Sequence, residues 1–92
     1  MSAWFVYLVE CVDGSLYTGI ATDVARRYWE HAAGTGARYT RSHPPRALLG
    51  AAPVADRSAA LKAENALRRL TPAGKRAWIA AHAVALPVPE PA

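Results

Sequence analysis

The segment that most constrains the fold is residues 3–11, a run rich in aromatic and β-branched side chains. Such a run is typical of a β-strand. Its alternating positions are apolar on both sides, with Trp4, Val6 and Leu8 on one face and Phe5, Tyr7, Val9 and Cys11 on the other. A strand that is apolar on both faces needs cover on both faces. The sequence therefore predicts a strand with other elements packed above and below it.

The rest of the chain predicts two more strands and three helices. A turn is predicted at Asp13-Gly14, directly before the second strand. The expected elements are a strand over residues 16–20, a helix from a cap at Thr22 or Asp23 to about Ala33, a weaker strand from Ala47 to Val54, a helix from a cap at Ser58 to about Leu70, and a last helix that starts at Thr71-Pro72 and fades near His82. Residues 37–46 are basic and irregular, with room for one helical turn.

This order, β-β-α-β-α-α, predicts an α+β fold with a small three-stranded, mainly antiparallel sheet flanked by helices. We expect one domain over residues 1–82, followed by a flexible Pro-rich tail over residues 83–92.

Composition excludes several classes of protein. With 92 residues, 52% of them hydrophobic and 20% charged, the chain fits one folded domain and not a disordered segment. It lacks an uncharged run long enough to span a membrane, and its start does not read as a signal peptide. The single cysteine, Cys11, excludes an intramolecular disulfide and a cysteine-based zinc site. A cytoplasmic protein is the expectation.

The charge balance favours an anionic partner. Eleven basic residues against seven acidic ones give a net charge of +4. Nine of the eleven are arginines, whose planar guanidinium matches phosphate oxygens better than lysine does. Phosphate binding and an arginine-rich genome explain this excess equally well.

The residues that can carry chemistry are Tyr7, Tyr17, Gly19, Arg27, His31 and Glu64. Their spacing resembles that of the GIY-YIG nuclease superfamily, most closely its small stand-alone bacterial members, the YhbQ-like group. Residues 5–7 and 17–19 resemble the two tripeptides of the family, although Phe5 and Val6 replace the first glycine and isoleucine. Residues 36–40 also resemble a loop of the small group, and the resemblance covers about residues 3–80.

The resemblance implies a metal-dependent endonuclease that hydrolyses phosphodiester bonds in DNA with one divalent cation, Mg²⁺ or Mn²⁺. Glu64 would hold the metal, and Arg27 would offset charge on the transition state. Tyr7 would activate water, assisted by Tyr17 or His31. A free tyrosine has a pKa of about 10, so Tyr7 needs a positive charge nearby. His31 is expected to titrate near neutral pH without help and is the alternative proton acceptor.

Such a site requires Tyr7 and Tyr17 to lie on one face of the sheet. A two-residue hairpin loop would put them on opposite faces, because a shift of one residue reverses every side chain of a strand. We therefore predict a loop of odd length or a β-bulge near Gly14 or Gly19.

A basic segment after the first helix is the candidate DNA-binding surface. It carries Arg38, Tyr39, Arg41 and Arg46, where arginine suits phosphates and tyrosine suits base stacking. The strand form of the DNA and the oligomeric state stay open.

Each residue also has an ordinary structural interpretation. Arg27 could pair with Asp23, Glu64 could pair with Arg68, and His31 could be a packed core residue. The basic segment could be a solvated loop. The alternative function is a nucleic-acid-binding module of the same fold that cleaves nothing.

Overall fold

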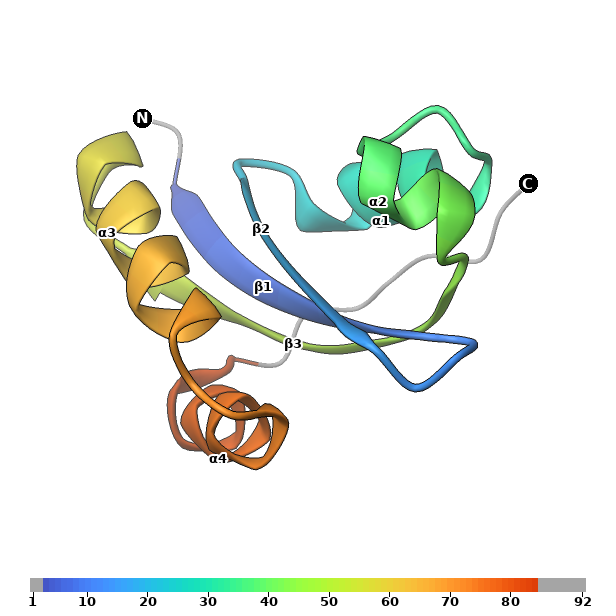
Figure 1. Ribbon diagram of the computed structural model, residues 1–92. Coiled ribbons are helices and arrows are strands. Elements are labelled where there is room, and N and C mark those ends of the chain that lie inside the picture. The colour runs from blue at the N-terminus through green and yellow to red at the C-terminus, as the bar shows by residue number, and fades with distance from the viewer. Residues whose placement is uncertain (1–2, 85–92) are drawn as a thin grey trace.

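The sheet has the predicted strand at its centre. The structure is a computed structural model that describes residues 3–84. β1 (Trp4–Cys11) lies between β2 (Leu16–Ala21) and β3 (Pro45–Val54), and both outer strands are antiparallel to it (Figure 1). The expectation that residues 3–11 are covered on both faces is confirmed, because β1 is buried from Val6 to Val9.

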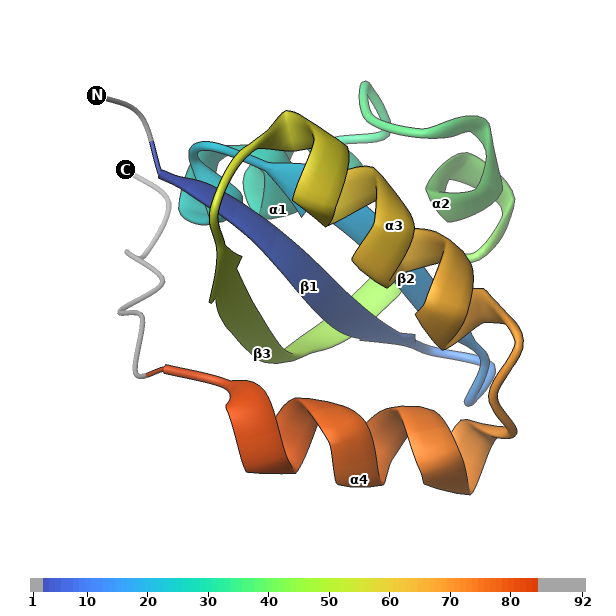
Figure 2. The same ribbon diagram turned by 90° about the vertical axis from the view of Figure 1, so that its left-hand side faces the viewer.

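Two helices cover each face of the sheet (Figures 1 and 2). α1 (Val24–Ala32) and the short α2 (Arg38–Ser42) lie on one side, whereas α3 (Arg57–Arg68) and α4 (Pro72–His82) lie on the other. The element order is the predicted one, with α2 as the helical turn within the basic segment. No helix of residues 3–84 is long and apolar enough to cross a membrane.

Alternate residues of β1 belong to two separate cores. Val6 and Leu8 pack with Leu67 of α3 and Ile79 of α4 in an aliphatic core, together with Ala52. Tyr7 and Val9 pack on the opposite face with Ala51 and with Val24 and Tyr28 of α1. Successive side chains of a strand point to opposite faces, and the side chains of a helix repeat every 3.6 residues, so each face of β1 meets one apolar stripe of the helices that cover it.

The hairpin between β1 and β2 has a three-residue loop. Cys11 N–H donates to the Ser15 carbonyl oxygen at 2.8 Å, so the loop spans residues 12–14. Gly14 ends it with a φ of +85°, the left-handed conformation that glycine adopts without strain. As a result Tyr7 pairs with Gly19, and Tyr17 lies on the same face as Tyr7. The predicted odd loop length is confirmed.

Several boundaries differ from those predicted. The cap of α3 is Asp56 and not Ser58, because the Asp56 carboxylate accepts a hydrogen bond from Ala59 N–H at 2.8 Å. β3 begins at Pro45, two residues early. Val84, placed in the predicted tail, forms a β-bridge with Ala51. The remainder of that tail, residues 85–92, lies outside the described residues.

Candidate active site

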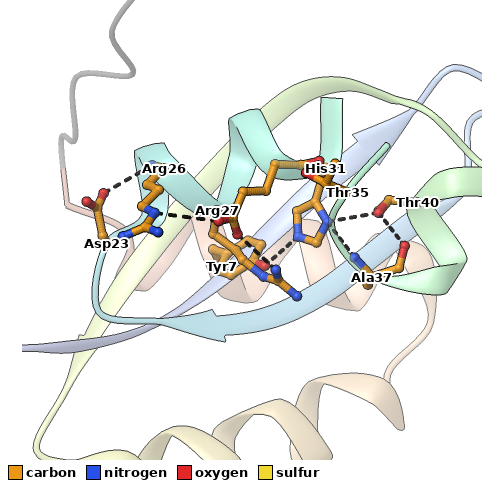
Figure 3. A network of polar contacts seen from close by, with 9 residues as sticks. Tyr7, Asp23, Arg26, Arg27, His31, Thr35, Ala37 and Thr40 are labelled. Carbon is orange, nitrogen blue, oxygen red and sulfur yellow. Dashed lines mark hydrogen bonds and ion pairs between the residues drawn. The ribbon is translucent and has the colours of Figure 1, made fainter. Parts of the chain in front are cut away.

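The centre of the site is a hydrogen bond between two buried side chains. Tyr7 Oη lies 2.7 Å from His31 Nε2, joining the middle of β1 to the last turn of α1 (Figure 3). Each residue is only 1% exposed. Gly19 makes this placement possible, since a Cβ there would collide with the Tyr7 hydroxyl. Gly19 is thus the close backbone approach that a glycine inside a strand indicates.

The other ring nitrogen of His31 is held by the segment that leads into α2. Ala37 N–H donates to His31 Nδ1 at 3.2 Å, and Thr40 Oγ1 lies 2.8 Å from the same nitrogen (Figure 3). A Cβ at Gly36 would occupy the position of the ring, so glycine is required there.

This network assigns the proton of the ring. A backbone amide only donates, so Nδ1 must offer a lone pair to Ala37. Neutral His31 therefore carries its proton on Nε2 and donates it to the Tyr7 oxygen.

The environment keeps His31 neutral. Burial, and after it the nearby positive charge of Arg27, lower the pKa of His31 from 6.5 to about 4. The expectation that His31 titrates near neutral pH is therefore wrong. The sequence does not reveal this burial, because it depends on the packing of α1 and α2 against the sheet.

The pKa of Tyr7 moves in the opposite direction. Burial raises it well above 10, and the neighbouring Tyr17 raises it further. The guanidinium of Arg27 acts against this rise and the carboxylate of Glu64 adds to it. Burial raises the pKa of Tyr17 as well. The positive charge of Arg27 lowers this pKa, and the negative charge of Glu64 raises it. Arg27 and Glu64 thus lie close enough to the two tyrosines to act on their pKa values, but Arg27 alone does not offset the burial of Tyr7.

The two charged residues each have an ion-pair partner. Arg27 Nη1 lies 2.9 Å from Glu30 Oε1, one helical turn further along α1. It does not use the predicted Asp23, whose side chain caps α1 instead. Glu64 Oε2 lies 3.4 Å from Arg68 Nη2, the predicted partner, and the Glu64 side chain is 14% exposed.

Glu64 is the candidate metal ligand. No group of three His, Cys, Asp or Glu side chains among residues 3–84 could hold a metal ion. A lone carboxylate still fits Mg²⁺ or Mn²⁺, because such hard cations accept water and phosphate oxygens as their remaining ligands. Glu64 provides such a carboxylate, and its charge acts on the pKa of both tyrosines.

Only part of the predicted DNA-binding surface joins the site. The Tyr39 ring stacks on Tyr17 at a centroid distance of 5.9 Å, and Tyr17 is 5.1 Å from the His31 ring. Arg38 and Arg41 are exposed on α2.

Arg46 points elsewhere. Its Nη2 lies 2.8 Å from Glu10 Oε1, and Glu10 also binds Arg76 of α4. Glu10 follows Leu8 on the α3–α4 side of β1, so the structure separates Arg46 from Tyr39. A pair so distant in sequence has no local signature.

Sequence analysis missed the residues that hold His31 and Arg27. They are Gly36, Ala37 and Thr40 around His31, and Glu30 beside Arg27. The signals were present. Residues 36–40 already resembled a family loop, and Glu30 lies three residues after Arg27, on the same helix surface.

Comparison with known proteins points to one family. The GIY-YIG catalytic domain matches residues 3–77. A UPF0213 protein of Cupriavidus necator is 52% identical over 91 residues, which cover 99% of this chain and 95% of the relative. The UPF0213 protein YhbQ of Escherichia coli is 46% identical over 84 residues, covering 91% and 84%. The solution NMR structure of a UPF0213 protein from Bacillus halodurans matches with a TM-score of 0.53 and 37% identity, over 86% of this chain and 84% of that one.

Proposed function

Because this chain belongs to the GIY-YIG catalytic domain family, we propose that it is a metal-dependent endonuclease that hydrolyses phosphodiester bonds in DNA. The observation that carries the proposal is the buried hydrogen bond between Tyr7 Oη and His31 Nε2, with Arg27 and Glu64 close enough to act on the pKa of Tyr7. A buried group with a perturbed pKa and specific charged neighbours is typical of a catalytic site.

Tyr7 is the proton acceptor in this mechanism. Its phenolate oxygen takes a proton from water, the water oxygen bonds to phosphorus, and the bond from phosphorus to the leaving sugar oxygen breaks. His31 supports the phenolate by donating its Nε2 proton in a hydrogen bond, and does not itself take the proton. Arg27 offsets the charge that develops on the phosphoryl oxygens. Because burial raises the pKa of Tyr7, cleavage should speed up as the pH rises above neutral.

Glu64 would hold one Mg²⁺ or Mn²⁺. When bound, such a cation polarises the phosphoryl group and steadies the leaving oxygen. Arg38, Arg41 and Tyr39 would contact the DNA from α2, with phosphates on the two arginines. Arg46 remains a candidate for a more distant phosphate, although its pair with Glu10 must first be released.

The decisive test removes one oxygen atom from Tyr7. We expect Tyr7→Phe to lower metal-dependent cleavage of labelled DNA by about 10² to 10⁴-fold, because a general base is lost. Tyr28→Phe is the matched control, since Tyr28 of α1 is buried in the same core but its hydroxyl is not among the hydrogen-bond partners of the His31 ring, Tyr7, Thr40 and Ala37. Cleavage by Tyr7→Phe at the rate of the wild type would refute the assigned role.

A second test addresses Glu64. Glu64→Gln keeps the shape of the side chain and removes the charge that binds a cation. Cleavage should fall by orders of magnitude, whereas DNA affinity without metal should stay equal or rise, because a charge that repels phosphate is gone. Undiminished cleavage would exclude Glu64 from the mechanism. DNA binding by a wild-type protein that cuts no substrate would favour the non-catalytic binding module.

A further inference from the structure

A hollow of about 250 Å³ adjoins the site along the open edge of β2. Its walls come from four elements that are far apart in sequence. They are Leu16, Tyr17 and Thr18 of β2, Tyr39 of α2, Arg68 of α3 and Lys75 of α4. Tyr17 is shared with the site, since its ring centroid lies 6.4 Å from that of Tyr7. Whatever occupies the hollow therefore lies next to the reacting phosphate of the proposed function.

The lining combines positive charge with aromatic rings. Lys75 forms no ion pair with any residue between 3 and 84, and Arg68 has only the 3.4 Å contact with Glu64. Among residues 3–84, no carboxylate lines the hollow. Tyr39 is 37% exposed; its ring stacks on His43 at a centroid distance of 4.0 Å and lies 5.9 Å from the ring of Tyr17. Cations together with aromatic rings are the combination that binds single-stranded nucleic acid, with the phosphate on the cation and the base on the ring.

One buried polar atom in this lining lacks a partner. Thr18 is 4% exposed, and its Oγ1 forms no hydrogen bond within the described part of the chain. Buried polar atoms are normally hydrogen-bonded, so an exception calls for a physical reason. A ligand atom that reaches Thr18 from the hollow would supply the missing bond.

A second hollow at the other end of β2 also combines arginines with an aromatic ring, Trp4, but differs in its charge balance. It is lined by Arg26 and Arg27, but also by Asp23 and Glu30. Both arginines lie within ion-pair distance of Glu30, at 3.5 and 2.9 Å. Two arginines thus face two carboxylates in this lining. Arg68 of the first hollow is paired as well, with Glu64, but Lys75 adds a positive charge that no described carboxylate pairs with, so the hollow at Lys75 is the better anion site.

We propose that the hollow at Tyr39 and Lys75 binds one unpaired nucleotide next to the scissile phosphate. The base packs against the exposed part of the Tyr39 ring, which His43 supports from behind, and Lys75 with Arg68 contacts its phosphate. Side chains stack on a base only after it has left the stack of a duplex. The preferred substrate is therefore single-stranded DNA or a strand that is unpaired at the cut. The position of the cut rests on the proposed function, but occupation of the hollow does not.

The test measures binding in the presence of EDTA, where metal-dependent cleavage cannot occur. The probes are a fluorescein-labelled single-stranded oligodeoxynucleotide and the same sequence as a duplex, followed by anisotropy across a range of salt concentrations. Tyr39→Ala should weaken single-strand binding by at least about fivefold, and Tyr39→Phe should retain it, because phenylalanine still stacks.

Lysine variants provide an independent comparison, since the chain has only two lysines, Lys62 and Lys75. Lys75→Gln should weaken single-strand binding and reduce the salt slope by about 0.7, the value for one lost phosphate contact. Lys62→Gln removes the same charge from an exposed position of α3 outside the hollow and should change both quantities less.

The proposal fails if Tyr39→Ala and Lys75→Gln bind the single strand as the wild type does. It also fails if the duplex binds as tightly as the single strand and both variants weaken the two equally. Binding that follows the expected pattern in a protein that cuts nothing would keep the nucleotide site and reject the nuclease.

Discussion

The two faces of β1 use neighbouring residues for different purposes. On the α3–α4 face, Val6 and Leu8 are covered by aliphatic side chains. On the α1 face, Tyr7 is buried to the same degree but ends in a hydroxyl that needs His31. Burial on the first face stabilises the fold directly, whereas burial on the second also shifts the pKa values of Tyr7 and His31.

The comparison teaches that one strand can bury aliphatic side chains in one core and a hydrogen-bonded hydroxyl in the other. The period of two sends successive side chains to opposite cores. We expect changes of shape in the aliphatic core to cost stability alone, whereas changes in the polar core should act through its hydrogen bonds and through pH.

The largest expected effects come from substituting two adjacent residues of β1, Leu8 and Tyr7, which belong to different faces. Leu8→Ala should lower the free energy of unfolding by about 2–5 kcal/mol, because it leaves a cavity in the aliphatic core. Cleavage per folded molecule should be preserved. Tyr7→Phe should behave in the opposite way, with activity lost and most stability kept. Denaturant unfolding and single-turnover cleavage on both variants measure this, and a parallel loss of both properties in Leu8→Ala would break the distinction.

The next largest effect is a pH dependence of the free energy of unfolding, which we expect from His31 on the polar face of β1. Between pH 6.5 and about 4 the unfolded chain binds a proton at His31 and the folded protein does not. The contribution of His31 to stability is thus fully present above pH 6.5 and is lost as the pH falls toward 4, by about 3 kcal/mol in all. Urea unfolding against pH measures this loss. His31→Gln should flatten the dependence, and His82→Gln, at an exposed position of α4, should leave it unchanged.

The smallest expected effect is a loss of stability in a variant that tests which group sets the tautomer of the His31 ring. Thr40→Val keeps the shape of a buried side chain and removes its hydroxyl, so stability should fall by about 1 kcal/mol. Ala37 N–H still donates to Nδ1, and ¹⁵N NMR should therefore find the ring proton on Nε2. A proton on Nδ1 in this variant would show that Thr40, and not Ala37, sets the tautomer.

Much of the fold could be predicted because its signals are local. The apolar run at residues 3–11, the glycine at position 14 and the Thr71-Pro72 start of α4 each act over a few residues. The gathering of Tyr7, Tyr17 and His31 also followed, since hairpin register and helical spacing determine which side chains share a face.

Other features depend on contacts between distant segments. Asp56 and Ser58 are both good cap residues, and only the path of the chain out of β3 selects Asp56. Arg46 turns to Glu10 because β3 starts early enough to bring them together. The hollow at Lys75 exists only once α2, α3 and α4 meet at the edge of β2.

The three-residue loop at residues 12–14 has a consequence for how such chains can change length. One residue added or removed there reverses the faces of β2, so Tyr17 would leave the site while the composition stays almost the same. An insertion of two residues preserves the phase of the strand. The length of this loop can therefore change only by an even number of residues if Tyr17 is to stay in place. No strand register depends on the length of the exposed segment at residues 33–35, between α1 and α2.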